Sequence, residues 1–212
     1  MKEFVTLNFD PAICRFQLEE FKELLQQKKP LSEKNDILPF FRERIQLSTF
    51  IGSYHKNIER LNRVAFEFDI FGDFAADLAV GDSRKKSYCF IEFEDARLNS
   101  VFVSKTGKYC PDWSPRFEKG FSQIIDWFWK IDDLERTDDF ENRFGGRRID
   151  YIGMLIIGRN DYLEPREKKR LVWRQEHLVL NSKHVYCLTF DDLYNDLRFR
   201  INKYYRIPET DG

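Results

Sequence analysis

The sequence predicts an α/β fold in which helices flank a central mixed β-sheet. Two observations carry this prediction. The first half contains three short strand-like segments joined by tight turns, and the second half alternates strand-like and helical segments. A meander followed by strand–helix–strand–helix order favours a sheet with antiparallel and parallel pairs, covered by helices. At 212 residues, 42% of them hydrophobic, the chain can bury a substantial core.

The N-terminal segment, residues 1–12, reads as a short lead ending in the turn signal Asp10-Pro11. Apolar residues then recur at helical spacing over residues 16–27. We expect this helix to stop before Lys28.

A second helix is expected after Ser32, which is a good N-cap. Pro39 can bend this helix or delay its regular start. Glu33 falls in the first turn, where the macrodipole favours a carboxylate. Two interpretations of Glu33 stay open: an acid that stabilises the helix end, or a site residue delivered by the helix.

Three strands are predicted after a loop over residues 52–62, and they span residues 64–68, 74–80 and 88–93. A polar turn over residues 81–86 joins the last two. Asp77 lies within the second strand, and Glu92 and Glu94 lie at the end of the third. Carboxylates in such apolar runs must be solvated, paired or bound to a metal.

Side chains alternate along a strand, so Glu92 and Glu94 point the same way, roughly 7 Å apart at Cα. Beside Asp77 these like charges raise at least one pKa unless a cation intervenes. Mg²⁺ could be held by Asp77, Glu92 and the backbone carbonyl of Phe93, with water and substrate phosphate completing its shell.

A simpler alternative is a surface network in which the acids pair with basic residues and need no special geometry. The candidate partners are Arg97, Lys105 and Arg116. The convergence of three acids in apolar runs favours the metal interpretation.

The clearest helix covers residues 113–131, with Ser114 as cap and Pro115 at the first helical position. One face is an apolar stripe. A second face carries Lys119, Gln123, Trp127 and Lys130. This Trp indicates either a partly exposed contact surface or a long aromatic side chain packed against another element.

The back half begins with a polar segment, residues 132–148, that we expect to be a mobile loop. Two apolar runs, residues 151–158 and 185–190, have the pattern of buried strands. A charged helix from Pro165 to about residue 178 separates them. Asp191 is expected to cap a final helix that runs to about residue 201.

Composition excludes several classes of function. Lys plus Arg (35) nearly cancel Asp plus Glu (36), which argues against nonspecific coating of nucleic acid. The four cysteines form no C-x-x-C pair, so zinc is not expected and a reducing cytoplasmic location is favoured. No apolar run is long enough for a membrane span, and no phosphate-cradling loop or nucleophile triad is evident.

Five motifs together resemble a known family. They are GDFAADLAVGD, FIEFEDA, FSQIIDW, YIGMLIIGR and VYCLTFDDL, in that order. Their order and spacing resemble the C-terminal nuclease domain of the Shedu family of bacterial anti-phage defence proteins, within the PD-(D/E)xK nuclease superfamily. The resemblance runs from Glu33 to Leu197 and implies a restriction-endonuclease-like core. On this basis residues 31–212 form the nuclease-like domain, and residues 1–30 form an N-terminal lead and helix that can pack on it.

The resemblance implies roles for several residues. Asp77 and Glu92 would be the two metal-binding acids for Mg²⁺ or Mn²⁺. Glu33 would be the helix-borne acid and Gln123 the polar helix residue near the site. The superfamily has lysine two residues after the second acid, and this chain has Glu94 there.

That departure leaves three outcomes. Glu94 could be a further ligand in a carboxylate-rich metal site, a basic residue could come from elsewhere, or the chain could bind DNA without cutting it. Lys119 is the best basic candidate, because it lies one turn before Gln123 on the same helical face.

The sequence therefore favours a metal-dependent DNA endonuclease of a prokaryotic defence system. The first alternative is a catalytically inactive nuclease-like module that senses DNA or a phage component. A second alternative is a protein-interaction domain in which the acids only pair with basic residues. The resemblance also implies a homo-oligomer and a phage-derived trigger.

Overall fold

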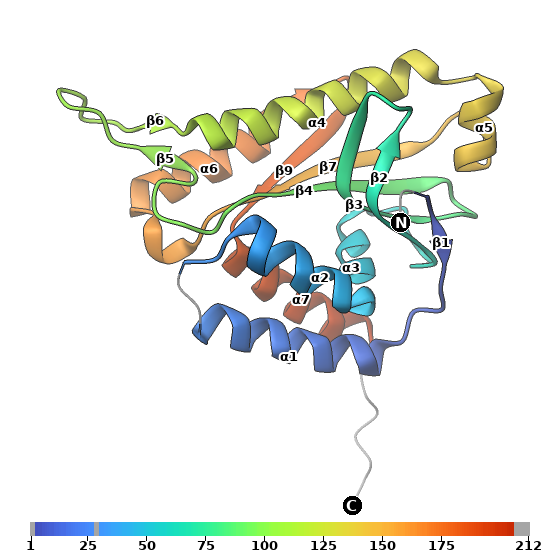
Figure 1. The fold of residues 1–212 in the computed structure, drawn as a ribbon, viewed down its shortest axis with the longest axis horizontal. Helices are drawn as coiled ribbons and strands as arrows, with labels where there is room; N and C mark the ends of the chain where they lie inside the picture. Colours follow the sequence, from blue (N-terminus) through green and yellow to red (C-terminus); the bar gives the residue numbers. More distant parts are fainter. Residues whose placement is uncertain (1–2, 28–29, 206–212) are drawn as a thin grey trace, which may run out of the picture.

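The computed structural model describes residues 3–27 and 30–205. A seven-stranded sheet has the order β1-β2-β3-β4-β7-β9-β8 (Figure 1). Its strands are β1 (Val5–Thr6), β2 (Arg63–Ile70), β3 (Phe74–Asp82), β4 (Ser87–Phe93), β7 (Asp150–Ile156), β8 (Val179–Leu180) and β9 (Lys183–Leu188). A separate hairpin consists of β5 (Phe102–Val103) and β6 (Asp112–Trp113). The α-helices are α1 (Pro11–Gln27), α2 (Leu38–Glu43), α3 (Ile45–Phe50), α4 (Pro115–Leu134), α5 (Asp138–Phe144), α6 (Pro165–His177) and α7 (Phe190–Tyr204).

The sheet is mixed, which confirms the predicted fold class. β1 to β4 pair antiparallel with their neighbours, whereas β4, β7 and β9 pair parallel. The predicted meander is therefore β2–β3–β4. Every residue of β4 is buried, as befits a strand at the centre of the sheet.

Helices cover both faces of the sheet (Figure 1). One core contains side chains of α1, α2, α3 and α7, and the other contains those of α4, α5 and α6. β4 contributes Cys89, Ile91 and Phe93 to the first core. It contributes Tyr88 and Phe90 to the second. The predicted alternation along this strand is confirmed.

The β2–β3 hairpin changes faces halfway along. Phe66 lies in the first core and Phe68 in the second, and the residue between them, Glu67, has a left-handed φ of 50°. The register pairs Phe66 with Leu78 and Phe68 with Ala76, so Asp77 stands opposite Glu67 at the irregularity. The bend turns the far half of the hairpin toward α4. It also lets the Asp77 side chain reach the backbone of Phe93 on β4.

Helix α1 begins earlier than the sequence indicated. Asp10 is its cap, because its Oδ1 accepts hydrogen bonds from the backbone N–H groups of Ala12 and Ile13. Pro11 is therefore the first helical residue rather than part of a turn. The helix packs against α3 and α7 through its apolar stripe. It extends to Gln27, and residues 28 and 29 lie outside the described part of the chain.

The predicted second helix is three short pieces. Glu33–Ile37 is a π-helical turn, α2 follows with Pro39 in its first turn, and a break at Arg44 separates α2 from α3. Ser32 occupies the cap position, but its side chain makes no capping hydrogen bond. The prediction that Pro39 delays the regular helix is confirmed.

The polar segment predicted as a loop contains helix α5, so that prediction is wrong. Thr137 caps the helix through its side chain, and Gly145 ends it in a left-handed conformation with φ 75°. Phe140 and Phe144, four residues apart, anchor it in the core. The many charged residues of this segment obscure the helical spacing of its two phenylalanines in the sequence.

Two further predictions need correction or completion. The cap of α7 is Thr189, not Asp191, which instead receives hydrogen bonds from the Arg159 guanidinium at 2.9 Å. Trp127 has no exposed surface and packs in the second core. The packing alternative for this Trp is therefore the right one.

Candidate active site

The candidate site forms where β3 separates from β4. Their pairing ends at Leu78–Ile91, two residues before the end of β4. The backbone N–H of Phe93 would lose its partner there, but it donates to Asp77 Oδ2 at 2.8 Å. Because the N–H and C=O of one strand residue face the same side, the Phe93 carbonyl also points toward the departed strand. The bend thus places the Asp77 carboxylate beside the backbone of Phe93.

Glu92 and Glu94 lie on the α4 side of the sheet, as their alternation predicts. They are only 8% and 2% exposed. Helix α4 passes close above them at Gly120, where an added Cβ would lie 2.8 Å from Leu155 Cδ1 and 3.4 Å from Glu94 Cγ. A glycine at this position lets the helix cover the carboxylates closely.

Glu33 reaches the same place from the other side of the sheet. An isolated bridge joins Leu31 and Ala96, with N–O distances of 3.2 and 3.0 Å. Asp95 Oδ1 then accepts the backbone N–H of Glu33 at 2.7 Å. These contacts hold the π-helical turn against the end of β4, so its first residue projects toward the acids.

Arg116, in the first turn of α4, is the cation at the centre of this group. Its Nη1 lies 2.5 Å from Glu94 Oε2 and 3.5 Å from Glu33 Oε2. Its Nη2 lies 3.3 Å from Asp95 Oδ2. One guanidinium therefore connects the strand end with the π-helical turn.

Burial and mutual repulsion shift the acids toward their protonated forms. Burial, followed by the charges of Glu94 and Asp77, raises the pKa of Glu33 to about 7. Burial raises the pKa of Asp77 to about 6, although the Phe93 N–H opposes this shift. Burial and then the charges of Asp77, Glu94 and Glu33 raise the pKa of Glu92 to about 10, against the opposing charge of Lys119.

The two α4 residues predicted for the site differ in how they relate to it. Lys119 is exposed, and its charge acts on Glu92. Gln123 lies two turns after Arg116, and its Oε1 is buried with no hydrogen-bond partner in the described residues. The basic residue that touches Glu94 is Arg116, which sequence reasoning named only as a surface ion-pair partner.

The surface-network alternative holds in part. Arg97 Nε lies 3.5 Å from Asp95 Oδ2, and Arg116 contacts the buried acids, but Lys105 pairs with Asp112 on the hairpin. Within residues 3–27 and 30–205, no three His, Cys, Asp or Glu side chains are arranged so that they could hold a metal ion. In the described conformation Glu94 is in contact with the Arg116 guanidinium and not part of a set of metal ligands.

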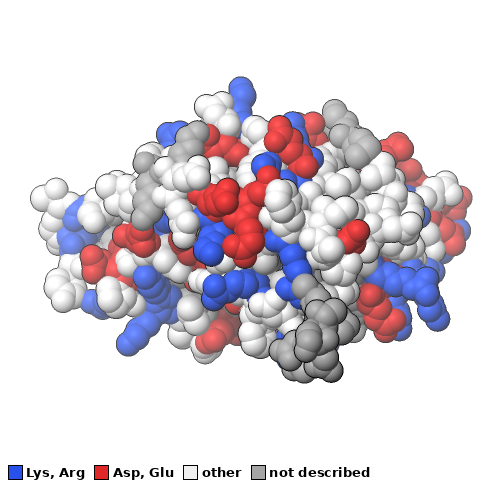
Figure 2. Space-filling view, turned by 90° about the horizontal axis from the view of Figure 1, so that it is seen from below, with Lys and Arg blue, Asp and Glu red and all other residues white. Residues whose placement is uncertain are grey.

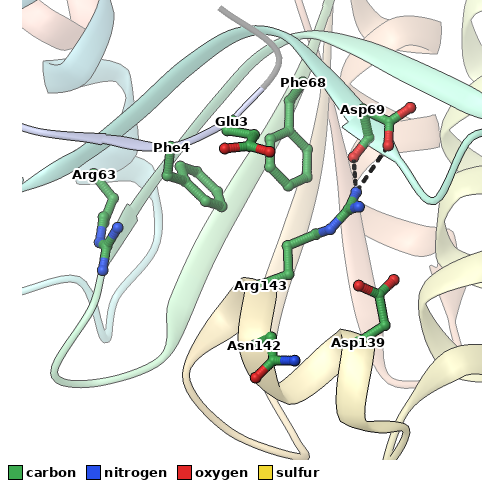
Figure 3. A pocket seen from close by; sticks show the side chains of 8 residues that line it. All are labelled: Glu3, Phe4, Arg63, Phe68, Asp69, Asp139, Asn142 and Arg143. Atoms are coloured by element: carbon green, nitrogen blue, oxygen red, sulfur yellow. Dashed lines mark hydrogen bonds and ion pairs between the residues drawn. The ribbon is translucent and has the colours of Figure 1, made fainter.

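A hollow of about 500 Å³ lies apart from these acids (Figure 3). Phe4 and Phe68 form its apolar wall, and Arg143 reaches across it to Asp69, with Nη1 3.0 Å from Oδ2. The positive charge of Arg143 is thus already neutralised by Asp69. None of the site acids lines this hollow, so it has no part in their chemistry.

Comparison with known families decides the assignment. A family model described as Shedu protein SduA, C-terminal, matches residues 31–194. The chain belongs to this Shedu family. Membership associates it with anti-phage defence. The match begins at Leu31, the residue that bridges to Ala96 beside the acids, and it ends within α7.

The Shedu match covers every strand from β2 to β9 and all of the site residues named above. A search of curated proteins finds no match to this chain. Among the described residues, no helix combines the length and hydrophobicity that a membrane crossing requires.

Proposed function

We propose that this Shedu domain is a DNA endonuclease that depends on Mg²⁺ or Mn²⁺ and hydrolyses phosphodiester bonds. The observation that carries the proposal is the contact between Arg116 and Glu94 beside Asp77 and Glu92. It supplies a positive charge where the superfamily pattern has lysine. From the sequence and the resemblance we also propose that the protein is cytoplasmic, forms a homo-oligomer and responds to a phage-derived trigger.

The donor chemistry of the site fits a hard divalent cation. Asp77 and Glu92 would hold it, with the Phe93 carbonyl and Glu94 as further oxygen ligands. Their raised pKa values support this, because a cation can replace the protons that otherwise relieve the repulsion. When bound, such an ion lowers the pKa of a coordinated water and offsets charge on the phosphate.

Each of the remaining residues has a defined task in the proposal. Arg116 stabilises negative charge on the scissile phosphate, which requires its guanidinium to leave Glu94 at least in part. Glu94 holds Arg116 in place before substrate arrives. Glu33, with a pKa of about 7, can exchange a proton near neutral pH. The exposed Lys119 would face the DNA strand from α4, whereas Gln123, with its Oε1 buried, would support the site from within the protein.

The direct test incubates the protein with supercoiled and linear DNA in Mg²⁺ or Mn²⁺, alongside Asp77→Asn and Glu92→Gln. The matched control is Asp69→Asn, a partly buried acid on β2 that pairs with Arg143 instead. We expect cleavage by the wild type and the control, and loss of cleavage in both site variants. Equal cleavage by Asp77→Asn would contradict the proposal.

The second candidate is a catalytically inactive module that binds DNA or a phage component as a sensor. It is favoured by the Arg116–Glu94 contact itself, which neutralises a potential ligand, and by the lack of a ready ligand group in the described residues. DNA binding without cleavage in either metal would support it.

A further inference from the structure

We propose that the outer face of α6 and the adjoining β5–β6 hairpin bind a single-stranded stretch of nucleic acid, with an unpaired base stacked on Trp173. The inference rests on the proposed DNA substrate and adds the surface that would hold the strand. It concerns binding rather than cleavage, so it can be tested without metal.

One face of α6 carries cations and an exposed aromatic residue together. At roughly 100° per residue, the side chains opposite the buried Leu171 fall on one arc. They are Arg166, Lys169, Trp173, Glu176 and His177, with Arg170 at the edge of the arc. Glu176 is the one acid among these residues, and Glu167 projects from the other side of the helix. The face is therefore basic although the whole protein is nearly neutral.

Trp173 is placed as a stacking platform. It is 59% exposed, and one side of its ring is covered by His177, with centroids 4.7 Å apart and planes 10° from parallel. The indole borders a hollow of about 330 Å³ that Trp113, Arg170 and Arg174 also line. The lining of this hollow is apolar, and both guanidinium groups already have partners, so a base would stack there on the aromatic ring and the arginine stems.

The hairpin extends this surface beyond the body of the molecule (Figure 1). Arg170 Nη1 donates to the Pro111 carbonyl at 2.7 Å, and the Arg166 guanidinium lies 5.3 Å from the Tyr109 ring centroid. Tyr109 is 93% exposed. Lys105 and Lys108 are also exposed, and they share a single acid, Asp112.

This surface adjoins the candidate active site through α4. Arg174 of α6 pairs with Glu118 at 2.8 Å, so α6 packs beside the first turns of α4. The hairpin ends directly before α4, because β6 stops at Trp113 and the helix begins at Pro115. A strand bound on the α6 face would therefore lie beside the first turns of α4, the helix that carries Arg116.

Charge and aromatic content together identify the occupant. Phosphates match the exposed cations, and exposed rings match unpaired bases, which a duplex would keep stacked. The face of α1 and α7 differs, because basic and acidic side chains are interspersed there (Figure 2). Where the described residues form that face, a phosphate chain would meet carboxylates between the cations.

The test measures fluorescence anisotropy of a labelled oligothymidine of about 20 nucleotides in EDTA. We expect Trp173→Ala to weaken binding about five- to a hundredfold, as expected for loss of base stacking. The matched control is Trp129→Ala on α4, because Trp129 is also 59% exposed. That control should bind like the wild type. An abasic strand of equal length should bind equally to wild type and Trp173→Ala.

A second arm tests the cations. Arg166→Gln should reduce the slope of log affinity against log salt by about 0.7, the value for one phosphate contact of a single strand. Arg198→Gln is the control, since Arg198 is exposed on α7 and also lies over a tyrosine ring, that of Tyr194. It should leave the slope unchanged.

Three results would overturn the inference. They are unchanged oligothymidine affinity in Trp173→Ala, equal loss in Trp129→Ala, and binding of a polyglutamate peptide with the same dependence on Trp173. The last would indicate an acidic protein partner. Because the assay contains no metal, a Trp173-dependent affinity supports this surface even if the protein proves unable to cleave DNA.

Discussion

Arg116 Nη1 lies 2.5 Å from Glu94 Oε2, so a helix-borne guanidinium contacts a buried carboxylate directly after the end of β4. The pair joins an almost fully buried carboxylate to an arginine that is partly exposed. Such an arrangement keeps a positive charge at the site without a lysine on the strand. It also explains how Glu94 is tolerated at the end of an apolar strand.

Reversing the charge at Glu94 tests this pairing. Glu94→Lys should lower the free energy of unfolding by about 2–4 kcal/mol, because it sets a buried ammonium against Arg116. The exposure of Arg116 keeps the loss toward the lower end. The swap Glu94→Lys with Arg116→Glu should recover much of the stability. Urea denaturation of both proteins and of Arg116→Glu completes the cycle, and additive losses would show that the pair is not coupled.

Asp77 should have separable structural and chemical roles. Asp77→Asn can still accept the Phe93 N–H and removes a buried charge, so its stability should equal or exceed that of the wild type. Asp77→Ala leaves that N–H unpaired and should cost about 1–3 kcal/mol. Thermal unfolding in EDTA compares the two. If both variants unfolded alike, the hydrogen bond would have no structural importance.

The raised pKa values predict competition between protons and metal. Folded-state pKa values of about 6 for Asp77 and about 7 for Glu33 exceed their ordinary values. The metal-free protein is therefore stabilised by this cluster at low pH and loses that stability as the pH rises through 6–7.

Added Mg²⁺ should accordingly raise the Tm more at a pH of about 8 than at about 6, because Asp77 and Glu33 are ionised at the higher pH. The proton on Glu92, whose pKa is about 10, must be displaced by the ion at both pH values. Asp77→Asn should abolish most of the rise. Equal shifts at both pH values, or an unchanged shift in the variant, would show that the cation binds elsewhere.

Some of the site could be predicted from sequence because strand geometry is regular. A period of two places Glu92 and Glu94 on one surface, and the turn before β4 returns Asp77 beside them. The buried strands β7 and β9 are recognisable in the sequence as apolar runs, a pattern typical of parallel strands.

Other features depend on tertiary contacts that have no local signature. The left-handed Glu67 bends the hairpin and frees Asp77, yet glutamate is not a residue that marks positive φ. Helical spacing favours Lys119 as the basic residue of the site, and the sequence indicates Arg116 only as an ion-pair partner of the acids. The tertiary contact of Arg116 with Glu94 shows which of the two approaches that carboxylate.

The central claim is that Arg116 supplies the charge of the absent lysine, and single-turnover cleavage of DNA tests it most directly. The comparison is between wild type, Arg116→Gln and Arg97→Gln; both arginines pair with Asp95, and only Arg116 contacts Glu94. We predict that Arg116→Gln cleaves at least about a hundredfold more slowly. Arg97→Gln should stay within about twofold of the wild type. An Arg116→Gln rate equal to that of the wild type would contradict the claim.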